Sequence, residues 1–109
     1  MQRTVLFIDT SDNKKTVVRI EKDGKTLEEQ EEPRVSASQA VLPLIDLILR
    51  NHSIPFSDIT EIRVHTGPGS FTGLRVGAAV ANALCWLLTI PVNGKKGKFV
   101  EPIYENSRW

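Results

Sequence analysis

The chain has 109 residues, which fits one small domain and leaves no room for a second full one. Hydrophobic residues make up 40% and charged residues 25% of the chain, so a wholly disordered protein is excluded. Fourteen basic and thirteen acidic residues give a formal charge of +1, which provides no global attraction to nucleic acid or to an anionic membrane.

The single cysteine, Cys85, excludes an intrachain disulfide and a zinc site built from several cysteines. Because it lies in an apolar stretch, we predict a small core residue. No run of apolar residues reaches the ~18 that a transmembrane helix needs. The apolar run that follows Arg3 is too short for a signal peptide, so we expect a cytoplasmic protein.

The N-terminal third predicts three strands. Residues 4–8 (TVLFI) form a short apolar, β-rich run that is typical of a strand buried on both faces. Residues 16–21 and 26–32 predict two further strands, and Asp23-Gly24 between them is the strongest two-residue hairpin signal. Charged residues dominate this hairpin, which predicts a solvated sheet edge.

A helix, a strand and a second helix are predicted to follow. The first helix runs to about Asn51 from a cap at Ser36 or Ser38, and Pro43 predicts a bend or a late start. Residues 59–65 alternate apolar and polar side chains, as a strand does. Residues 74–88 are almost wholly apolar and predict a long helix.

The last predicted strand is 90–92, and residues 94–109 are predicted to be irregular. Two right-handed crossovers then place the later strands beside the first and parallel to it. The sequence therefore predicts an α/β fold, with a five-stranded mixed sheet of order 3-2-1-4-5 and two main helices.

The most informative segment is the glycine-rich stretch GPGSFTGLR, which joins a predicted strand to a helix. It lacks the lysine of a Walker loop and the spacing of a dinucleotide fingerprint. Two interpretations stay open, a structural turn and an anion site at the helix N-terminus. The candidate residues are Asp9, Gly67, Gly69, Ser70, Thr72 and Gly73, with Ser70 or Thr72 as the helix cap.

Nothing in the sequence predicts a catalytic group, a metal site or a cofactor. Asp9 is expected to cap the turn after the first strand rather than to hold magnesium. Ser70 has no evident base partner, and His52 and His65 do not align with a second ligand.

The second helix is apolar nearly all round, whereas one sheet covers only one side of a helix. The surplus apolar face predicts a partner, and the small residues of this helix allow another helix to approach closely. The alternative is that the first helix and the tail cover that face. The predicted interface residues are Val41, Ile45, Ile48, Arg75, Ala78, Ala81 and Asn82.

These segments resemble the TsaB (YeaZ) family. The resemblance rests on GPGSFTGLR together with IDTS at 8–11, LPLID at 42–46 and IPV at 90–92, and it spans residues 4–93. It implies an actin-like, ribonuclease-H-like lobe. It also implies a non-catalytic role in making N6-threonylcarbamoyladenosine at tRNA position 37. In that role the two helices bind a TsaD ligase and form a four-helix bundle with it. A TsaE ATPase joins through the complex.

The chain departs from that family in two respects. Family members have two lobes, and we expect residues 1–93 to form the first lobe and 94–109 a tail, with the second lobe absent. Ala37 stands where the family often has histidine. Three hypotheses follow: a scaffold that contacts tRNA only indirectly and forms a homodimer when alone, a small phosphate- or nucleotide-binding protein that uses the Gly67–Gly73 loop, and a degenerate self-associating domain.

Overall fold

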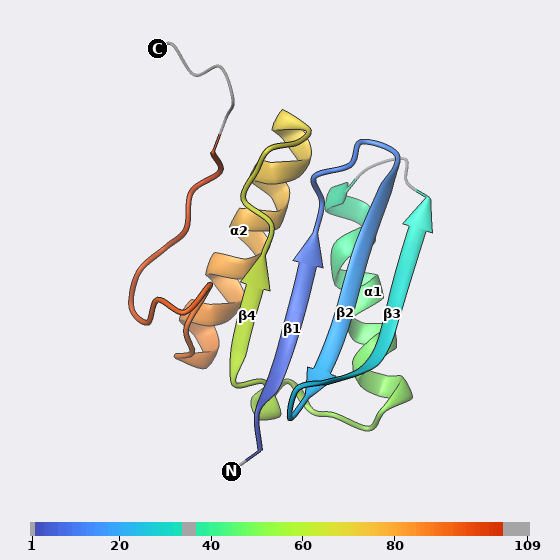
Figure 1. Ribbon diagram of the computed structural model, residues 1–109, viewed down its shortest axis with the longest axis vertical. Coiled ribbons are helices and arrows are strands. Elements are labelled where there is room, and N and C mark those ends of the chain that lie inside the picture. Colours follow the sequence, from blue (N-terminus) through green and yellow to red (C-terminus); the bar gives the residue numbers. More distant parts are fainter. Residues whose placement is uncertain (1, 34–36, 104–109) are drawn as a thin grey trace.

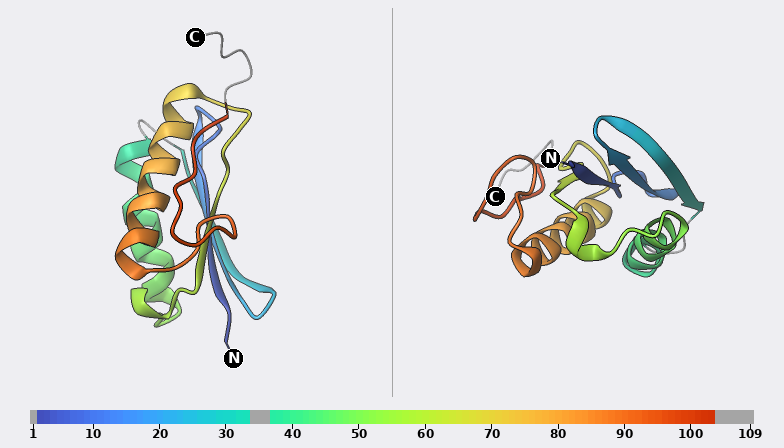
Figure 2. Two further views of the ribbon diagram at one scale, coloured as in Figure 1. Left: turned by 90° about the vertical axis from the view of Figure 1, so that its left-hand side faces the viewer. Right: turned by 90° about the horizontal axis from the view of Figure 1, so that it is seen from below.

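The computed structural model describes residues 2–33 and 37–103, and for residues 37 and 38 it describes the backbone only. A four-stranded sheet forms one layer and two helices form the other (Figures 1 and 2). The elements in chain order are β1 (Thr4–Asp9), β2 (Lys15–Lys22), β3 (Lys25–Pro33), α1 (Ala37–Asn51), a 3-10 turn η1 (Phe56–Asp58), β4 (Glu61–Val64) and α2 (Phe71–Leu88).

The sheet has the order β3-β2-β1-β4. β1 pairs antiparallel with β2 and parallel with β4, so the first four positions of the predicted order are confirmed. The hairpin turn is the predicted one: Asp23 and Gly24 both have positive φ, at 52° and 83°, as a tight two-residue turn with the right-handed strand twist requires.

The predicted fifth strand does not form, and this part of the prediction was wrong. Val92 makes only an isolated parallel bridge to Ile62, at the expected edge of the sheet. Asn93 and Gly94 have φ values of 49° and 79°, so the chain turns back at once and Val92 pairs with Lys95. Because Pro91 also lacks an amide hydrogen, the segment 90–92 is too short and too poor in donors for a strand.

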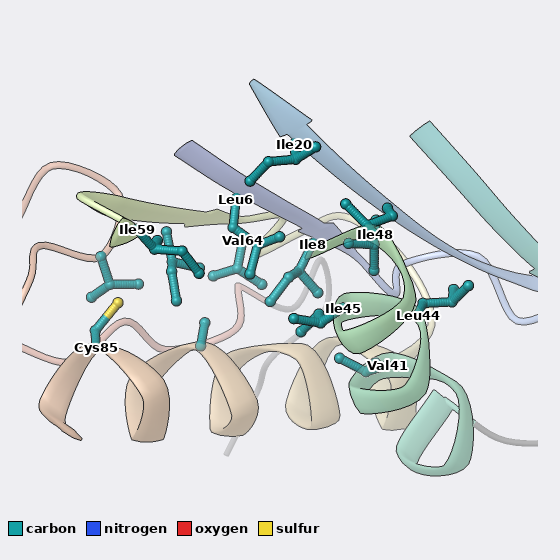
Figure 3. Packing of buried hydrophobic residues seen from close by; sticks show 14 of the residues in the cluster. Leu6, Ile8, Ile20, Val41, Leu44, Ile45, Ile48, Ile59, Val64 and Cys85 are labelled. Atoms are coloured by element: carbon teal, nitrogen blue, oxygen red, sulfur yellow. The ribbon is translucent and has the colours of Figure 1, made fainter. Parts of the chain in front are cut away.

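The hydrophobic core lies between the sheet and the two helices (Figure 3). Alternate residues of β1 face it, and Leu6 and Ile8 are fully buried there. The helices cover only this face (Figure 2). The prediction of a strand buried on both faces is confirmed at Val5, which is buried on the open face, but not at Phe7. On the open face Phe7 is half-buried, and the Arg19 guanidinium lies 4.1 Å from its ring centroid.

Both helices have a buried stripe at helical spacing. In α1 it comprises Val41, Leu44, Ile45, Ile48 and Leu49. The helix passes through Pro43, so the predicted late start was wrong; Pro43 is exposed, and the lost hydrogen bond leaves the buried stripe intact. Ser36 and the Ser38 side chain, the predicted caps, lie outside the described residues.

By length and composition alone, α2 would qualify as a membrane span, with a mean hydropathy of 1.4 over its 18 residues. It is one of the two helices that pack on the sheet, and its buried residues include Leu74, Ala78, Ala81 and Cys85. Only 33% of its 18 residues are buried, so packing on the sheet accounts for one side of the helix and leaves its other side apolar and exposed.

Candidate functional site

The glycine loop packs directly on the turn that follows β1. The Ser70 amide donates a hydrogen bond of 2.7 Å to the Ser11 carbonyl oxygen. A side chain at Gly69 would collide with Ser11, and one at Gly73 would overlap the carbonyl oxygen of Thr10. The glycines are therefore required because the two loops approach backbone to backbone.

Ser70 is the N-cap of α2, as predicted, and Thr72 is exposed in the first turn. The Ser70 hydroxyl oxygen accepts from the Gly73 amide at 3.4 Å, and its carbonyl oxygen accepts from the Leu74 amide at 2.8 Å. Several amides at this helix end thus bond to oxygens of the chain itself. These contacts favour the structural turn over the anion site.

Asp9 ends β1 and caps the turn after it, as expected from its neighbours. Its Oδ1 atom accepts hydrogen bonds from the Ser11 amide at 2.9 Å and the Ser11 hydroxyl at 2.5 Å. The His65 Nε2 atom lies 3.1 Å from the Pro68 carbonyl oxygen, and the His52 Nε2 atom lies 2.9 Å from Glu28 Oε1. Within residues 2–33 and 37–103 no three His, Cys, Asp or Glu side chains gather as a metal site would need.

Most of the predicted interface residues belong to the core of the lobe instead. The buried ones are Val41, Ile45, Ile48, Ala78 and Ala81, each at most 4% exposed. They lie on the helix faces that contact the sheet, so they are corrected here to core residues. Sequence periodicity located two apolar faces on each helix but did not tell which of the two the sheet covers.

Each helix also carries exposed apolar residues in addition to its buried stripe. On α2 the exposed residues Arg75, Ala79, Ala83 and Leu87 share one face, at spacings of four residues. On α1, Leu42 is 51% and Leu47 is 44% exposed. We call these six residues the outer helix face.

Asn82 holds the C-terminal segment against α2. Its Nδ2 atom donates to the Val100 carbonyl oxygen and its Oδ1 atom accepts from the Val100 amide, both at 2.9 Å. Val100 is buried, and the segment 94–103 runs along the edge of the lobe beside α2 and β4 (Figure 2). Asn82 was predicted as an interface residue, but its side chain binds the C-terminal segment of the same chain. Its signal in the sequence was a lone amide within an apolar helix.

Cys85 is a core residue, as predicted. Its thiol lies 3.5 Å from the Pro91 carbonyl oxygen, and burial raises the pKa of the thiol to about 11. A thiol with that pKa is almost fully protonated at neutral pH and is therefore a poor nucleophile.

The fold and the glycine loop define a single α/β lobe, and comparisons with known proteins show which family it belongs to. Residues 32–94, more than half of the chain, match the family model described as TsaD: tRNA N6-adenosine threonylcarbamoyltransferase. The chain is 31% identical over 90 residues to the tRNA threonylcarbamoyladenosine biosynthesis protein TsaB of Bacillus subtilis, and 35% identical over 89 residues to TsaB of Haemophilus influenzae. The chain therefore belongs to the family that this model describes, and within it to the TsaB (YeaZ) proteins.

Solved structures agree with that placement. YeaZ from Pseudomonas aeruginosa superposes with a TM-score of 0.76 at 30% identity, and the match covers 83% of this chain and 41% of that one. The matches to the two TsaB proteins cover 83% and 82% of this chain but only 39% and 37% of the relatives. The chain thus spans about two fifths of the length of the relatives that it matches.

Proposed function

We propose that this lobe is a non-catalytic partner in the biosynthesis of N6-threonylcarbamoyladenosine at position 37 of tRNA. It binds a TsaD-like ligase through the outer helix face, a TsaE-like ATPase joins through the complex, and the chain pairs with itself when no ligase is present. The names of the matched relatives support the pathway. We further propose that the protein acts in the cytoplasm.

The proposal that the ligase binds to the helices is supported by the composition of the outer helix face. It combines two exposed leucines of α1 with a leucine and two alanines of α2. Apolar side chains of both helices are therefore exposed to solvent. Ala79 and Ala83, one turn apart, allow close approach of a second helix pair. Arg75 at the start of α2 supplies a cation for a carboxylate of the partner.

The non-catalytic role is supported by the structural use of the polar groups nearest to the glycine loop. Asp9 and Ser70 each cap a turn or a helix, and His65 contacts the Pro68 carbonyl oxygen. The Ser70 hydroxyl oxygen accepts from the Gly73 amide, which is the role of a helix cap.

The experiment uses charge substitutions on the outer helix face. Ala79→Glu and Ala83→Glu are expected to weaken binding to the TsaD-type ligase of the same organism at least tenfold in calorimetry, because a buried, unpaired carboxylate is costly. They are also expected to convert the homodimer to a monomer in light scattering. Substitution of Ala78 or Ala81 is unsuitable, since both are buried in the lobe and a charge there would unfold it.

Ser57→Glu, at an exposed position in η1, is the matched control and should bind like the wild type. Unchanged ligase affinity and unchanged mass for both alanine variants would overturn the proposed surface. Calorimetry with ATP tests the alternative of a phosphate-binding protein: tight binding that is lost in Thr72→Ala, at an exposed position of the loop, would favour it.

A further inference from the structure

A pocket of about 420 Å³ lies at the C-terminal end of α2, between this helix and the segment that follows it. Trp86 and Phe99 line it, and they are 71% and 66% exposed. Lys96 and Lys98 line it as well, and no carboxylate is found among the described residues of its lining. Two exposed aromatic rings beside two ammonium groups are unusual on a small lobe, because such rings are normally buried.

The pocket is a fixed feature of the structure. Its wall on the tail side is held by the paired hydrogen bonds between Asn82 and the Val100 backbone. The turn at Asn93 and Gly94 sets the direction of the tail, and the Asn93 side chain bonds to both backbone groups of Val64, at 2.8 and 3.0 Å. Lys96, Lys98 and Phe99 are therefore presented from a segment that is anchored before and after them.

The lysines of the pocket lie far from the acidic residues of the hairpin. The acidic residues of β3, which include Glu28, Glu29, Glu31 and Glu32, lie at the opposite edge of the sheet from β4. The tail lies beside α2 and β4, so its lysines are on the far side of the lobe from these carboxylates (Figure 1). Three of the β3 carboxylates have ion-pair partners, since Glu31 pairs with Lys15, Glu29 with Arg19 and Glu28 with His52. The attraction for an anion therefore comes from Lys96 and Lys98 at the pocket itself.

We propose that this pocket binds a nucleotide of single-stranded RNA, with the base against Trp86 and Phe99 and the phosphates against Lys96 and Lys98. Aromatic side chains stack on bases in single-stranded RNA, and lysines neutralise the phosphates. An acidic peptide also suits the lysines, but it makes no use of two exposed rings. Phe99 and both lysines lie outside the stretch 32–94 that matches the family model, whereas Trp86 lies within it. The inference goes beyond the proposed function, in which tRNA is contacted only through the partner.

Trp86 is itself the reporter for the test. A Trp109→Phe background leaves Trp86 as the single tryptophan, and its fluorescence is titrated with a single-stranded RNA octamer of mixed sequence. We expect saturable quenching. Phe99→Ala should weaken binding by about 5-fold to 150-fold, the loss that one stacked base gives. The double variant Lys96→Glu/Lys98→Glu should also reduce the slope of log K against log salt by about 1.4, since each phosphate contact on a single strand contributes ~0.7.

Two remote substitutions serve as controls: Lys25→Glu on the hairpin and Phe56→Ala in η1, both of them exposed. They should bind RNA within twofold of the parent. Absence of quenching, or quenching that the pocket variants leave unchanged, would overturn the proposal, and so would equal affinity for an octameric poly-glutamate peptide. The titration needs no ligase, so its result is independent of the outer helix face: Ala79→Glu, about two turns away from Trp86, should retain RNA binding even though it loses the partner.

Discussion

Thr10 and Gly73 lock the end of β1 to the start of α2. The Thr10 hydroxyl donates a hydrogen bond of 2.5 Å to the Gly73 carbonyl oxygen, and Thr10 is fully buried. Gly77, one turn further along α2, lies under the same hydroxyl, where a methyl group would overlap it. The glycines of this helix thus set the distance at which the helix packs against the sheet.

Gly77→Ala tests this packing. In an exposed helix the change would stabilise by up to about 1 kcal/mol, since alanine is the better helix former. Here we expect it to lower the free energy of unfolding by about 1–3 kcal/mol, because the added methyl group overpacks a full core. Urea unfolding followed by circular dichroism measures the change.

A double substitution distinguishes overpacking from a general effect on the helix. Thr10→Ala removes the hydroxyl and its hydrogen bond to the Gly73 carbonyl oxygen, and it should by itself cost about 0.5–1.5 kcal/mol, the net contribution of one hydrogen bond. Combined with Gly77→Ala, it frees space for the new methyl group. We expect the double variant to lose less than the sum of the single losses, and strict additivity would contradict the contact.

Asn82→Ala is expected to release the C-terminal segment from α2. Both hydrogen bonds to Val100 are lost, and a remaining backbone anchor of the segment is the hydrogen bond of 2.6 Å from the Ile103 amide to the Thr66 carbonyl oxygen. The Val100 amide should then exchange with solvent at least tenfold faster in a hydrogen-exchange experiment, while the amides of Ile8 and Leu6 in the centre of the sheet stay protected. Equal exchange at Val100 in both proteins would show that other contacts hold the segment.

The Cys85 thiol should react slowly with iodoacetamide in the folded protein. Burial raises its pKa from 9.0 to about 11, which lowers the thiolate fraction at pH 8 about a hundredfold. We expect the alkylation rate at pH 8 to rise by about that factor or more when the protein is unfolded in urea. Reaction at the rate of a free thiol in the folded state would contradict the burial.

Raising the pH should weaken the fold through the same thiol. Its pKa is higher in the folded state, so its contribution to stability is complete below pH 9 and is lost as the pH rises toward about 11. Cys85→Ala should remove this part of the pH dependence in urea unfolding at pH 8, 9 and 10, although the substitution lowers stability at each pH. A wild-type profile that runs parallel to that of the variant would contradict the linkage.

Glu28 connects the acidic hairpin to the end of α1. The hydrogen bond from Gln30 contributes most to lowering the pKa of its carboxyl group. The hydrogen bond from Asn51 and the neighbouring His52 lower this pKa further. The stabilisation is present at neutral pH and is lost as the pH falls below the ordinary value of 4.5. Glu28→Gln should therefore be less stable than the wild type at pH 7, with the difference shrinking below pH 4.5. Glu32→Gln removes the same charge from an exposed position on β3 and is the control.

How far the sequence predicts this lobe depends on the kind of feature. Local chemistry was sufficient for Asp23-Gly24, whose turn needs two residues at positive φ, and for Ser70, whose hydroxyl caps the helix that follows. The fifth strand was predicted at 90–92 but does not form. Asn93-Gly94 is a hairpin signal like Asp23-Gly24, and it marks the chain reversal that ends this segment.

The sequence by itself determined the order of the elements, the turns, the buried cysteine and the glycine loop, because each depends on neighbouring residues or on a periodic pattern. Only the tertiary structure decided which side of each helix meets the sheet, so that Ala78 is core and Ala79 is surface. It alone brought Trp86 beside Phe99 and Asn82 beside Val100, since such contacts depend on where the chain returns in space.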